Sequence, residues 1–230
     1  MRYLALATDY DGTLAHRGEV DEATFAALAR LRESARKVVL VTGRELDELT
    51  KVCPRLDLFD RVVAENGALL YRPAWLESKV LAERPPESFV EALRARGVTP
   101  ISVGRVVVAT WRPHETTIAE VIRDSGLDLQ IVLNKRAVMV LPAGVTKASG
   151  LVSALEEIGV SPSDVVAVGD AENDLDFMAL CGCSAAVANA LDVVKRQADI
   201  VTQNDHGPGV AEVIALLLDT DLVRARHCGE

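Results

Sequence analysis

Two acidic side chains stand close together near the start of the chain, in the sequence Leu-Ala-Thr-Asp-Tyr-Asp-Gly-Thr-Leu. Asp9 and Asp11 follow an apolar run at residues 4–8, and residues two apart in a strand project to the same side of it. Carboxylates this close repel each other unless a cation or a shared proton relieves them, and Gly12 lets the backbone turn sharply around whatever binds. The pair predicts a catalytic site, against the alternative of a surface turn with incidental acids.

A hydroxyl, a glycine and a cation follow a second apolar run, at residues 37–41. In Thr42-Gly43-Arg44 the threonine hydroxyl and the backbone N–H groups around the glycine can donate hydrogen bonds to phosphate oxygens, helped by the start of the following helix. The triplet favours oxyanion binding. Threonine is also a routine helix cap, so the triplet alone leaves that role open.

A lysine and a second acidic cluster lie later in the chain. Lys147 stands early in a predicted amphipathic helix that runs to Ile158 before Gly159 stops it, and Asp170 and Asp174 follow an apolar run at residues 165–168. Ligands of open parallel sheets bind at the carboxyl ends of the strands, so these groups are expected to share one crevice with the first acidic pair. The alternative for the lysine is a solvated surface position.

The donor set formed by Asp9, Asp170 and the backbone carbonyl of Asp11 is hard and rich in oxygen. Magnesium keeps several waters and takes the rest of its octahedron from carboxylate and phosphate oxygens, so we expect a magnesium ion here. The four cysteines show no zinc-type pairing and the four histidines are scattered, which leaves a zinc or histidine-based centre with little support.

The elements that position these groups follow from the hydrophobic pattern. Short β-branched apolar runs alternate with helical periodicity at both ends of the chain, which is typical of a parallel α/β domain, while the middle reads twice as a helix followed by two strands. We expect an α/β fold with a Rossmann-like parallel-sheet core at residues 1–84 and 143–230 and an inserted α+β cap domain at residues 85–142. The expected core strands are residues 3–8, 37–41, 61–64, 165–168, 185–188 and 200–202, and the expected cap elements are helices 87–96 and 115–125 with strands 98–103, 105–111, 129–133 and 137–141.

The composition limits the partners of the protein. With 230 residues, 49% of them hydrophobic, the chain is long enough for a substantial core. Its formal net charge of −9 argues against nonspecific binding to nucleic acid or to an anionic membrane surface. No run approaches the ~18 apolar residues of a membrane span, so we expect a cytoplasmic protein that associates with neither nucleic acid nor membrane.

In this order, the motifs resemble those of the haloacid dehalogenase (HAD) superfamily. The inserted segment follows Glu65-Asn66-Gly67-Ala68 and lies between the second and third motifs, as in the branch of Cof-type sugar phosphatases, sucrose-phosphate phosphatases and archaeal phosphoglycolate phosphatases. The resemblance covers most of the chain. The matching segments are Asp9-Tyr10-Asp11-Gly12-Thr13, Thr42-Gly43-Arg44, Lys147 and Gly169-Asp170-Ala171-Glu172-Asn173-Asp174.

The resemblance implies roles for the matching side chains. Asp9 would attack phosphorus and form an aspartyl-phosphate, and Asp11 would protonate the leaving oxygen and then deprotonate the attacking water. Thr42 and Lys147 would hold the phosphoryl oxygens as charge shifts in the transition state. Family members with the second aspartate intact are usually phosphatases, so Asp11 favours hydrolysis of a phosphate ester.

The resemblance also implies metal-binding and substrate-binding residues. Magnesium would be bound by Asp9, Asp11, Asp170 and Asp174, the last acting through a water or by orienting Lys147. The implied phosphate or substrate contacts are Gly12, Gly43, Arg44, Asn66, Arg112 and Asn173, although Asn66-Gly67 is also a favoured turn pair and Asn173 could cap a helix. Specificity would come from cap cations, for which Arg112, His114, Lys135 and Arg136 are candidates unless they are ordinary loop charges.

The sequence therefore predicts a magnesium-dependent phosphatase acting on a small phosphorylated metabolite, either a sugar phosphate or a phosphoglycolate-like acid. Three alternatives stay open. One is a phosphoryl transferase similar to phosphomannomutase, and another is a non-catalytic binding module, against which the intact acid pair counts. The third is a signalling receiver phosphorylated on aspartate, although receivers are about half this length and have no inserted cap. We expect a monomer or a homodimer.

Overall fold

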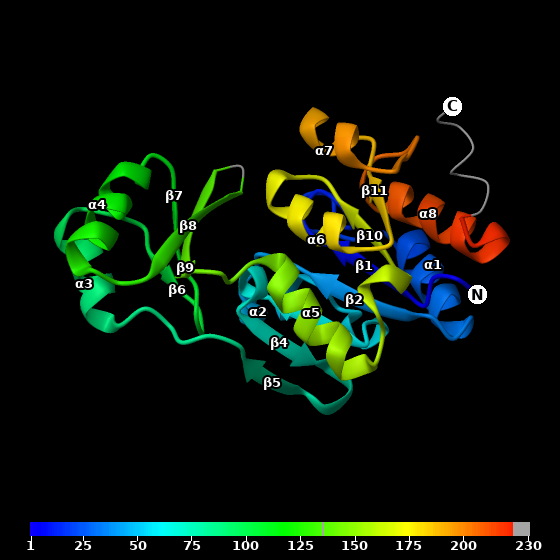
Figure 1. The fold of residues 1–230 in the computed structure, drawn as a ribbon, viewed down its shortest axis with the longest axis horizontal. Helices are drawn as coiled ribbons and strands as arrows, with labels where there is room; N and C mark the ends of the chain where they lie inside the picture. The colour runs from blue at the N-terminus through cyan, green and yellow to red at the C-terminus, as the bar shows by residue number, and fades with distance from the viewer. Residues whose placement is uncertain (135, 223–230) are drawn as a thin grey trace.

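The computed structural model describes residues 1–134 and 136–222, so Lys135 lies outside the described residues (Figure 1). Its main sheet has eight strands in the order β12-β11-β10-β1-β2-β3-β4-β5. Six of them run parallel, which confirms the expected α/β core. The strands are β1 (Ala5–Asp9), β2 (Lys37–Val41), β3 (Arg61–Ala64), β4 (Leu69–Arg72), β5 (Glu77–Val80), β10 (Val165–Gly169), β11 (Cys183–Ala186) and β12 (Ile200–Val201).

The main sheet differs from the expectation at several strands; β1, for example, was expected at residues 3–8 and spans Ala5–Asp9. The antiparallel strands β4 and β5 were not expected. All four residues of β5 are exposed and three are polar, so no apolar run marks that strand. The strand expected at residues 185–188 lies at Cys183–Ala186 instead. The polar Ser184 interrupts the apolar pattern at the start of this strand, so the pattern did not reveal it. The backbone N–H and the hydroxyl of Ser184 both donate to Asp199.

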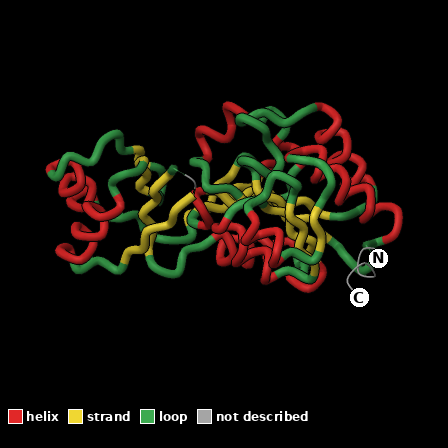
Figure 2. Tube along the Cα trace, turned by 90° about the horizontal axis from the view of Figure 1, so that it is seen from above, coloured by secondary structure: helices red, strands yellow, loops and turns green. Residues whose placement is uncertain are grey.

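Helices cover both faces of the main sheet (Figure 2). On one face α1 packs against β2 and α8, and on the other α5 packs against β2, β3 and β4. The side chain of Asp21 caps α1 by accepting the N–H of Thr24, and the face of the helix that carries Phe25, Leu28 and Leu31 is buried. The core helices are α1 (Glu22–Glu33), α2 (Leu46–Val52), α5 (Lys147–Ile158), α6 (Leu175–Leu180), α7 (Asp192–Gln197) and α8 (His206–Thr220), with short 3-10 helices η1 (Leu56–Leu58), η2 (Glu65–Gly67), η3 (Pro73–Trp75), η4 (Pro162–Asp164) and η5 (Glu172–Asp174).

A separate four-stranded antiparallel sheet lies between β5 and α5 in the chain, in the order β6-β7-β9-β8. We call this sheet and its two helices the cap. Its elements are α3 (Glu87–Ala95), β6 (Ser102–Val103), β7 (Val108–Trp111), α4 (Glu115–Ser125), β8 (Leu129–Asn134) and β9 (Ala137–Pro142). Both helices lie on the side of the cap sheet away from the core, so the other face of the sheet looks toward the core (Figures 1 and 2). The exact residues at which the core ends and the cap begins stay a prediction.

The first two cap strands are shorter than expected. They were placed at residues 98–103 and 105–111, but the ladder includes only Ser102–Val103 and Val108–Trp111. The N–H groups of Arg105, Val106 and Val107 donate to a side chain of the core instead of to a neighbouring strand. A strand pattern in the sequence cannot reveal that competition, because the acceptor is about forty residues away.

Helix α5 is fastened to the sheet by Glu157. This carboxylate accepts hydrogen bonds from Arg72 at 2.5 and 2.9 Å and from Arg61 at 2.9 Å, so one side chain joins α5 to β3 and β4. The hydrogen bonds from Arg72, with a smaller contribution from Arg61, lower the pKa of Glu157 to about 2. The geometry of α5 matters because the helix begins at Lys147.

We expect Glu157→Gln to lower the free energy of unfolding by about 1 kcal/mol at pH 7. The folded-state pKa lies below the unfolded value near 4.5, so the stabilisation is present above pH 4.5 and is lost as the pH falls toward 2. Urea unfolding of both proteins between pH 7 and pH 3 measures this, and the difference should shrink with falling pH. Glu156→Gln, at an exposed neighbouring position, is the control, and a difference that stays constant across the range would contradict the prediction.

Candidate active site

The predicted motifs meet at the carboxyl edge of the main sheet. Asp9 ends β1 and stands opposite Val41, the last residue of β2, so Thr42 follows at the same level. Asp170 follows directly on β10, which pairs with β1 on its other side. Asp9, Asp170 and Thr42 are all buried. The adjacency of three parallel strands therefore brings together groups that are far apart in the sequence.

Lys147 joins two of the aspartates. Its Nζ lies 2.5 Å from Oδ1 of Asp9 and 2.6 Å from Oδ1 of Asp174, and the lysine is 1% exposed. Burial raises the pKa of Asp9 to about 8 although the Lys147 ammonium works against it. Burial would lower the pKa of Lys147, but Asp174 and Asp9 together raise it above its usual value. The lysine is therefore a charged, fixed donor at the centre of the site and not a solvated surface residue.

The other oxygen of Asp174 is held by the backbone. Oδ2 accepts the N–H groups of Asp170 at 2.9 Å and of Ala171 at 3.0 Å, which leaves Oδ1 for Lys147. This contact corresponds to the orienting role expected for Asp174. Thr13 donates its hydroxyl to Oδ1 of Asp170 at 3.1 Å. Thr13 lies in the first motif, but no role was predicted for it from the sequence.

Three carboxylates form a cluster suited to a divalent cation. Oxygens of Asp9, Asp170 and Asp174 lie within 4.8 Å of one another, and all three side chains are buried. With Lys147 beside them, three ionised carboxylates carry a net charge of −2, which is unfavourable in a buried site unless a cation balances it. The hard oxygen donors fit a divalent ion, so a metal site here follows from the donor chemistry.

The start of α5 is placed by a close backbone approach. Thr146 accepts the N–H of Ser149 on its side-chain oxygen, and Ser149 accepts the N–H of Thr146 on its hydroxyl, which forms a capping box. Gly67 has a φ of 107°, and a Cβ atom there would stand 1.9 Å from the carbonyl oxygen of Thr146. Only glycine lets η2 approach the helix so closely. This packing places Lys147 in the first turn, facing Asp9.

Asp11 and Arg44 form a two-pronged ion pair. Arg44 donates from Nε to Oδ2 of Asp11 at 2.6 Å and from Nη2 to Oδ1 at 2.7 Å. Both side chains are partly exposed, at 35% for Asp11 and 26% for Arg44. The Asp11 carboxylate lies outside the buried cluster, which fits the expectation that only its backbone carbonyl would meet a metal.

Hydrogen bonds connect the second and fourth motifs. The hydroxyl oxygen of Thr42 accepts the N–H of Arg44 at 3.1 Å, which leaves the hydroxyl proton for another acceptor. The carbonyl of Thr42 accepts the N–H of Asn66, and the side chain of Asn66 accepts from Asn173 at 3.4 Å. Gly43 faces the cap, since a Cβ atom there would lie 3.5 Å from Sδ of Met139 in β9. Met139 thus belongs to the surroundings of the site, and no sequence motif marks it.

Among the residues that the structure describes, two buried amide oxygens have no hydrogen-bond partner, Oδ1 of Asn173 and Oδ1 of Asn134. Asn134 ends β8, and β8 contacts η5, which contains Asn173. The cap hairpin therefore reaches the fourth motif. Asn134 was not among the residues expected from the sequence.

The cap cations expected to bind substrate have other contacts. Arg112 is 48% exposed on its side chain and pairs with Glu115 at 3.2 Å, while His114 Nε2 lies 3.2 Å from the carbonyl oxygen of Thr99. Arg136 is exposed, and its carbonyl accepts the N–H of Arg112 at 2.9 Å. Lys135, the fourth candidate, falls outside the described part of the chain. Their role in specificity stays a prediction.

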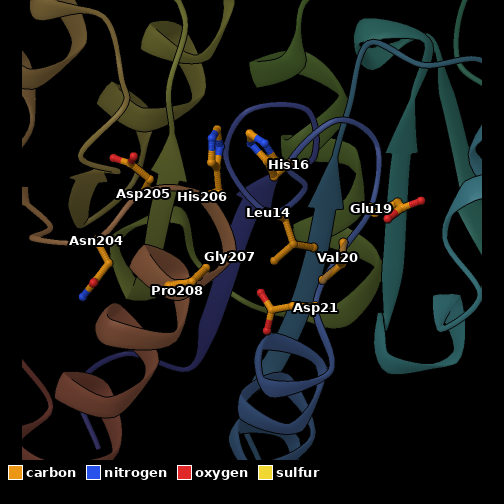
Figure 3. A pocket seen from close by; sticks show the side chains of 10 residues that line it. All are labelled: Leu14, His16, Glu19, Val20, Asp21, Asn204, Asp205, His206, Gly207 and Pro208. Atoms are coloured by element: carbon orange, nitrogen blue, oxygen red, sulfur yellow. The ribbon is translucent and has the colours of Figure 1, made fainter.

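The loop after Asp11 contacts residues from the carboxyl-terminal part of the chain. Gly12 has a φ of 95°, as its predicted turn requires, and its carbonyl oxygen lies 2.7 Å from Nδ2 of Asn189 and 2.9 Å from Nδ1 of His206. His206 stands beside His16, with ring centroids 4.6 Å apart, at a cavity of about 570 Å³ (Figure 3). Asn189 and His206 were missed because a support for a backbone carbonyl leaves no pattern of charge or spacing.

Comparison with known proteins gives consistent matches. A family model described as haloacid dehalogenase-like hydrolase matches residues 6–104 and 118–214. Phosphoglycolate phosphatase from Halorubrum lacusprofundi is 34% identical over 221 residues, which cover 91% of this chain and 95% of that protein. Phosphoglycolate phosphatase from Methanothermobacter thermautotrophicus is 31% identical over 219 residues, covering 91% of this chain and 96% of that protein.

Solved structures agree on the fold. Protein 0175 of Thermoplasma acidophilum superimposes with a TM-score of 0.81 at 16% identity, covering 94% of this chain and 98% of that one. A sugar phosphatase of HAD subclass IIB gives a TM-score of 0.72 at 20% identity, covering 92% and 97%. Within residues 1–134 and 136–222, no helix is long and apolar enough to cross a membrane.

Proposed function

Because the chain belongs to the haloacid dehalogenase-like hydrolases and is a phosphatase of that family, we propose that it hydrolyses phosphoglycolate or a closely related small phosphorylated acid. The proposal of substrate is supported by relatives named phosphoglycolate phosphatase that are 34% and 31% identical and align over nearly their whole length. The observation that carries the chemistry is the buried lysine that bridges Asp9 and Asp174. It fixes a carboxylate beside a cationic donor, which is the arrangement that phosphoryl transfer requires.

In the proposed reaction Asp9 is the nucleophile. Lys147 holds Oδ1, so Oδ2 attacks phosphorus, the bond to the ester oxygen breaks, and the departing alkoxide takes a proton from Asp11. A water then attacks the aspartyl-phosphate, gives its proton to Asp11, and releases inorganic phosphate and free Asp9. Thr42 donates its hydroxyl proton to a phosphoryl oxygen, and the Lys147 ammonium stabilises the charge that develops there.

Asp9, Asp170 and the backbone carbonyl of Asp11 would hold a magnesium ion, which would supply positive charge to the phosphoryl oxygens when bound. Asp174 keeps Lys147 in place, because its second oxygen is tied to the backbone of the same loop. Arg44 is paired with Asp11, so this arginine lies beside the group proposed to give its proton to the ester oxygen. The transferase alternative differs only in the acceptor, a sugar hydroxyl in place of water.

A second candidate substrate class is a sugar or polyol phosphate. The unpartnered oxygens of Asn134 and Asn173 at the contact of cap and core favour it, because carbonyl oxygens accept hydrogen bonds from hydroxyl groups. A carboxylate on the leaving group would instead accept hydrogen bonds from the NH₂ groups of these amides. The cytoplasmic location and the monomeric or dimeric state expected from the sequence stay predictions.

The test is phosphate release from phosphoglycolate, a set of sugar phosphates and p-nitrophenyl phosphate. We expect the highest kcat/KM for phosphoglycolate; a sugar phosphate preferred by more than about 10-fold would favour the second class. Isomer formation from a sugar phosphate, without release of phosphate, would instead support the transferase.

Removing divalent cations should abolish turnover. We expect EDTA followed by desalting to lower kcat on the order of 10³-fold, because three buried carboxylates lose their balancing charge and the phosphoryl group loses its cation. Magnesium should restore the rate, and calcium should restore little, because Ca²⁺ takes more oxygen ligands at longer distances than Mg²⁺ does. Rates measured against free Mg²⁺ concentration check this, and full activity in EDTA would contradict it.

A further inference from the structure

Glu65 is a buried acid for which the proposed reaction has no use. It lies in η2 at the end of β3, is 1% exposed, and has a φ of 50°. A glutamate in the left-handed region is strained, and such strain persists only where the surroundings demand it. Burying a carboxylate is also unfavourable unless its oxygens are well bonded. Both features require an explanation from the contacts of the side chain.

The contacts of the Glu65 carboxylate cross from the core to the cap. Oε1 accepts the N–H of Arg105 at 2.9 Å, and Oε2 accepts the N–H groups of Val106 at 2.7 Å and Val107 at 2.8 Å. These three consecutive donors lie in the cap turn between β6 and β7. Three convergent N–H groups can stabilise a full negative charge without a neighbouring cation.

The turn is shaped for this carboxylate. A Cβ atom at Gly104 would stand 2.8 Å from Oε2 of Glu65, so the carboxylate occupies the space beside a residue without a side chain. Apolar packing surrounds the contact, since Val106, Val107, Met139 and Leu141 of the cap form one buried cluster with Ala68 of the core. Nearby, Ser102 donates its hydroxyl to Glu45, a second contact between the core and this part of the cap.

The same segment also touches the active site. The N–H of Glu65 donates to the carbonyl of Arg44, and the next residue, Asn66, bonds to Thr42 and Asn173. On the cap side, β7 pairs with β9, which carries Met139 above Gly43. A change at Glu65 would therefore shift the cap strand that covers Gly43, in the Thr42-Gly43-Arg44 segment expected to bind phosphate.

We propose that Glu65 is a positioning residue that fastens the cap to the core, its carboxylate binding the three N–H groups of residues 105–107 and so holding β7 and β9 over the active-site edge. No metal, substrate or proton transfer is involved. The contact sets the distance between the residues that bind the phosphoryl group and the cap residues that face the rest of the substrate. The consequence for substrate affinity rests on the proposed function, whereas the contact itself does not.

Amide hydrogen exchange without substrate tests the contact directly. We expect Glu65→Ala to raise the exchange rates of the amides of Arg105, Val106 and Val107 on the order of 10-fold or more, and Glu65→Gln to raise them less, because its one carbonyl oxygen still accepts hydrogen bonds. Amides of the cap strands β8 and β9 should change by less than about 2-fold. Glu83→Gln, the same chemical change at an exposed position in the chain leading to the cap, should alter none of them.

A variant on the cap side keeps the test valid if the Glu65 variants fold poorly. Gly104→Ala should raise the same three exchange rates, because its methyl group would overlap the carboxylate. Added to Glu65→Ala, it should raise them less than it does in the wild-type protein, since the carboxylate is then gone and only Cγ1 of Val107, 2.9 Å from the added Cβ atom, still overlaps with it. Unchanged exchange at residues 105–107 in Glu65→Ala and in Gly104→Ala, or equal acceleration throughout the cap, would overturn the proposal.

Kinetics give a second readout. For the best substrate, KM should rise about 10-fold in Glu65→Ala and less in Glu65→Gln, while kcat changes less than KM, since the catalytic groups keep their contacts. A fall in kcat with unchanged KM would overturn a positioning role. If the enzyme accepts none of the tested esters, the proposed function fails, yet the exchange experiment still decides whether Glu65 holds the cap.

Discussion

Replacing Asp9 by asparagine should lower kcat for every substrate on the order of 10⁴-fold or more, because the amide cannot attack phosphorus. The substitution is nearly isosteric, and the amide oxygen can still accept the hydrogen bond that Lys147 now donates to Oδ1. The fold should therefore be retained, which circular dichroism and thermal unfolding would confirm. Steady-state phosphate release with saturating magnesium measures the loss.

Two further observations separate a lost nucleophile from a damaged site. Brief incubation of the wild-type protein with labelled substrate and acid quenching should trap label on the protein, and Asp9→Asn should trap none. Asp219→Asn, the same change at an exposed position in α8, should leave turnover within about 2-fold of wild type. Residual activity of Asp9→Asn above about 1% would mean that another group attacks phosphorus.

Lys147→Met should have the second largest effect, on both activity and stability. Removing the ammonium leaves Asp9 and Asp174 facing each other in a site where the lysine is 1% exposed, and breaking a buried ion pair in this way costs about 3–5 kcal/mol. We also expect kcat to fall on the order of 10³-fold, because the developing phosphoryl charge loses a fixed donor.

Urea unfolding with and without magnesium separates the two effects of Lys147→Met. Magnesium should recover part of the lost stability, since a cation can balance the negative charge of the carboxylates that have lost the lysine, but it should not restore turnover. Lys51→Met, at an exposed site on α2, should change the free energy of unfolding by less than about 0.5 kcal/mol. Wild-type stability of Lys147→Met in the absence of magnesium would show that the two aspartates do not depend on this lysine.

The sequence was sufficient for much of the fold and for the identity of the catalytic groups. Strands such as Lys37–Val41 and Arg61–Ala64 were predicted at their observed bounds, because a buried strand is a short, continuous β-branched run. Asp9, Thr42 and Asp170 follow such runs directly, and parallel strands end at one edge of the sheet. Local sequence patterns and the rule that parallel strands end at one edge of a sheet were therefore enough to predict that these three side chains lie close together.

The sequence could not indicate with which residue each polar side chain would form its hydrogen bond or ion pair. Lys147 and Asp9 are 138 positions apart, Arg44 pairs with Asp11, and Glu65 contacts a cap turn about forty residues away. β5 has no apolar pattern, and Met139 reaches Gly43 only because the cap folds back over the core. Burial of apolar runs is a local property of the chain and can be read along it, whereas hydrogen bonds and ion pairs form between side chains that tertiary packing brings within a few ångströms.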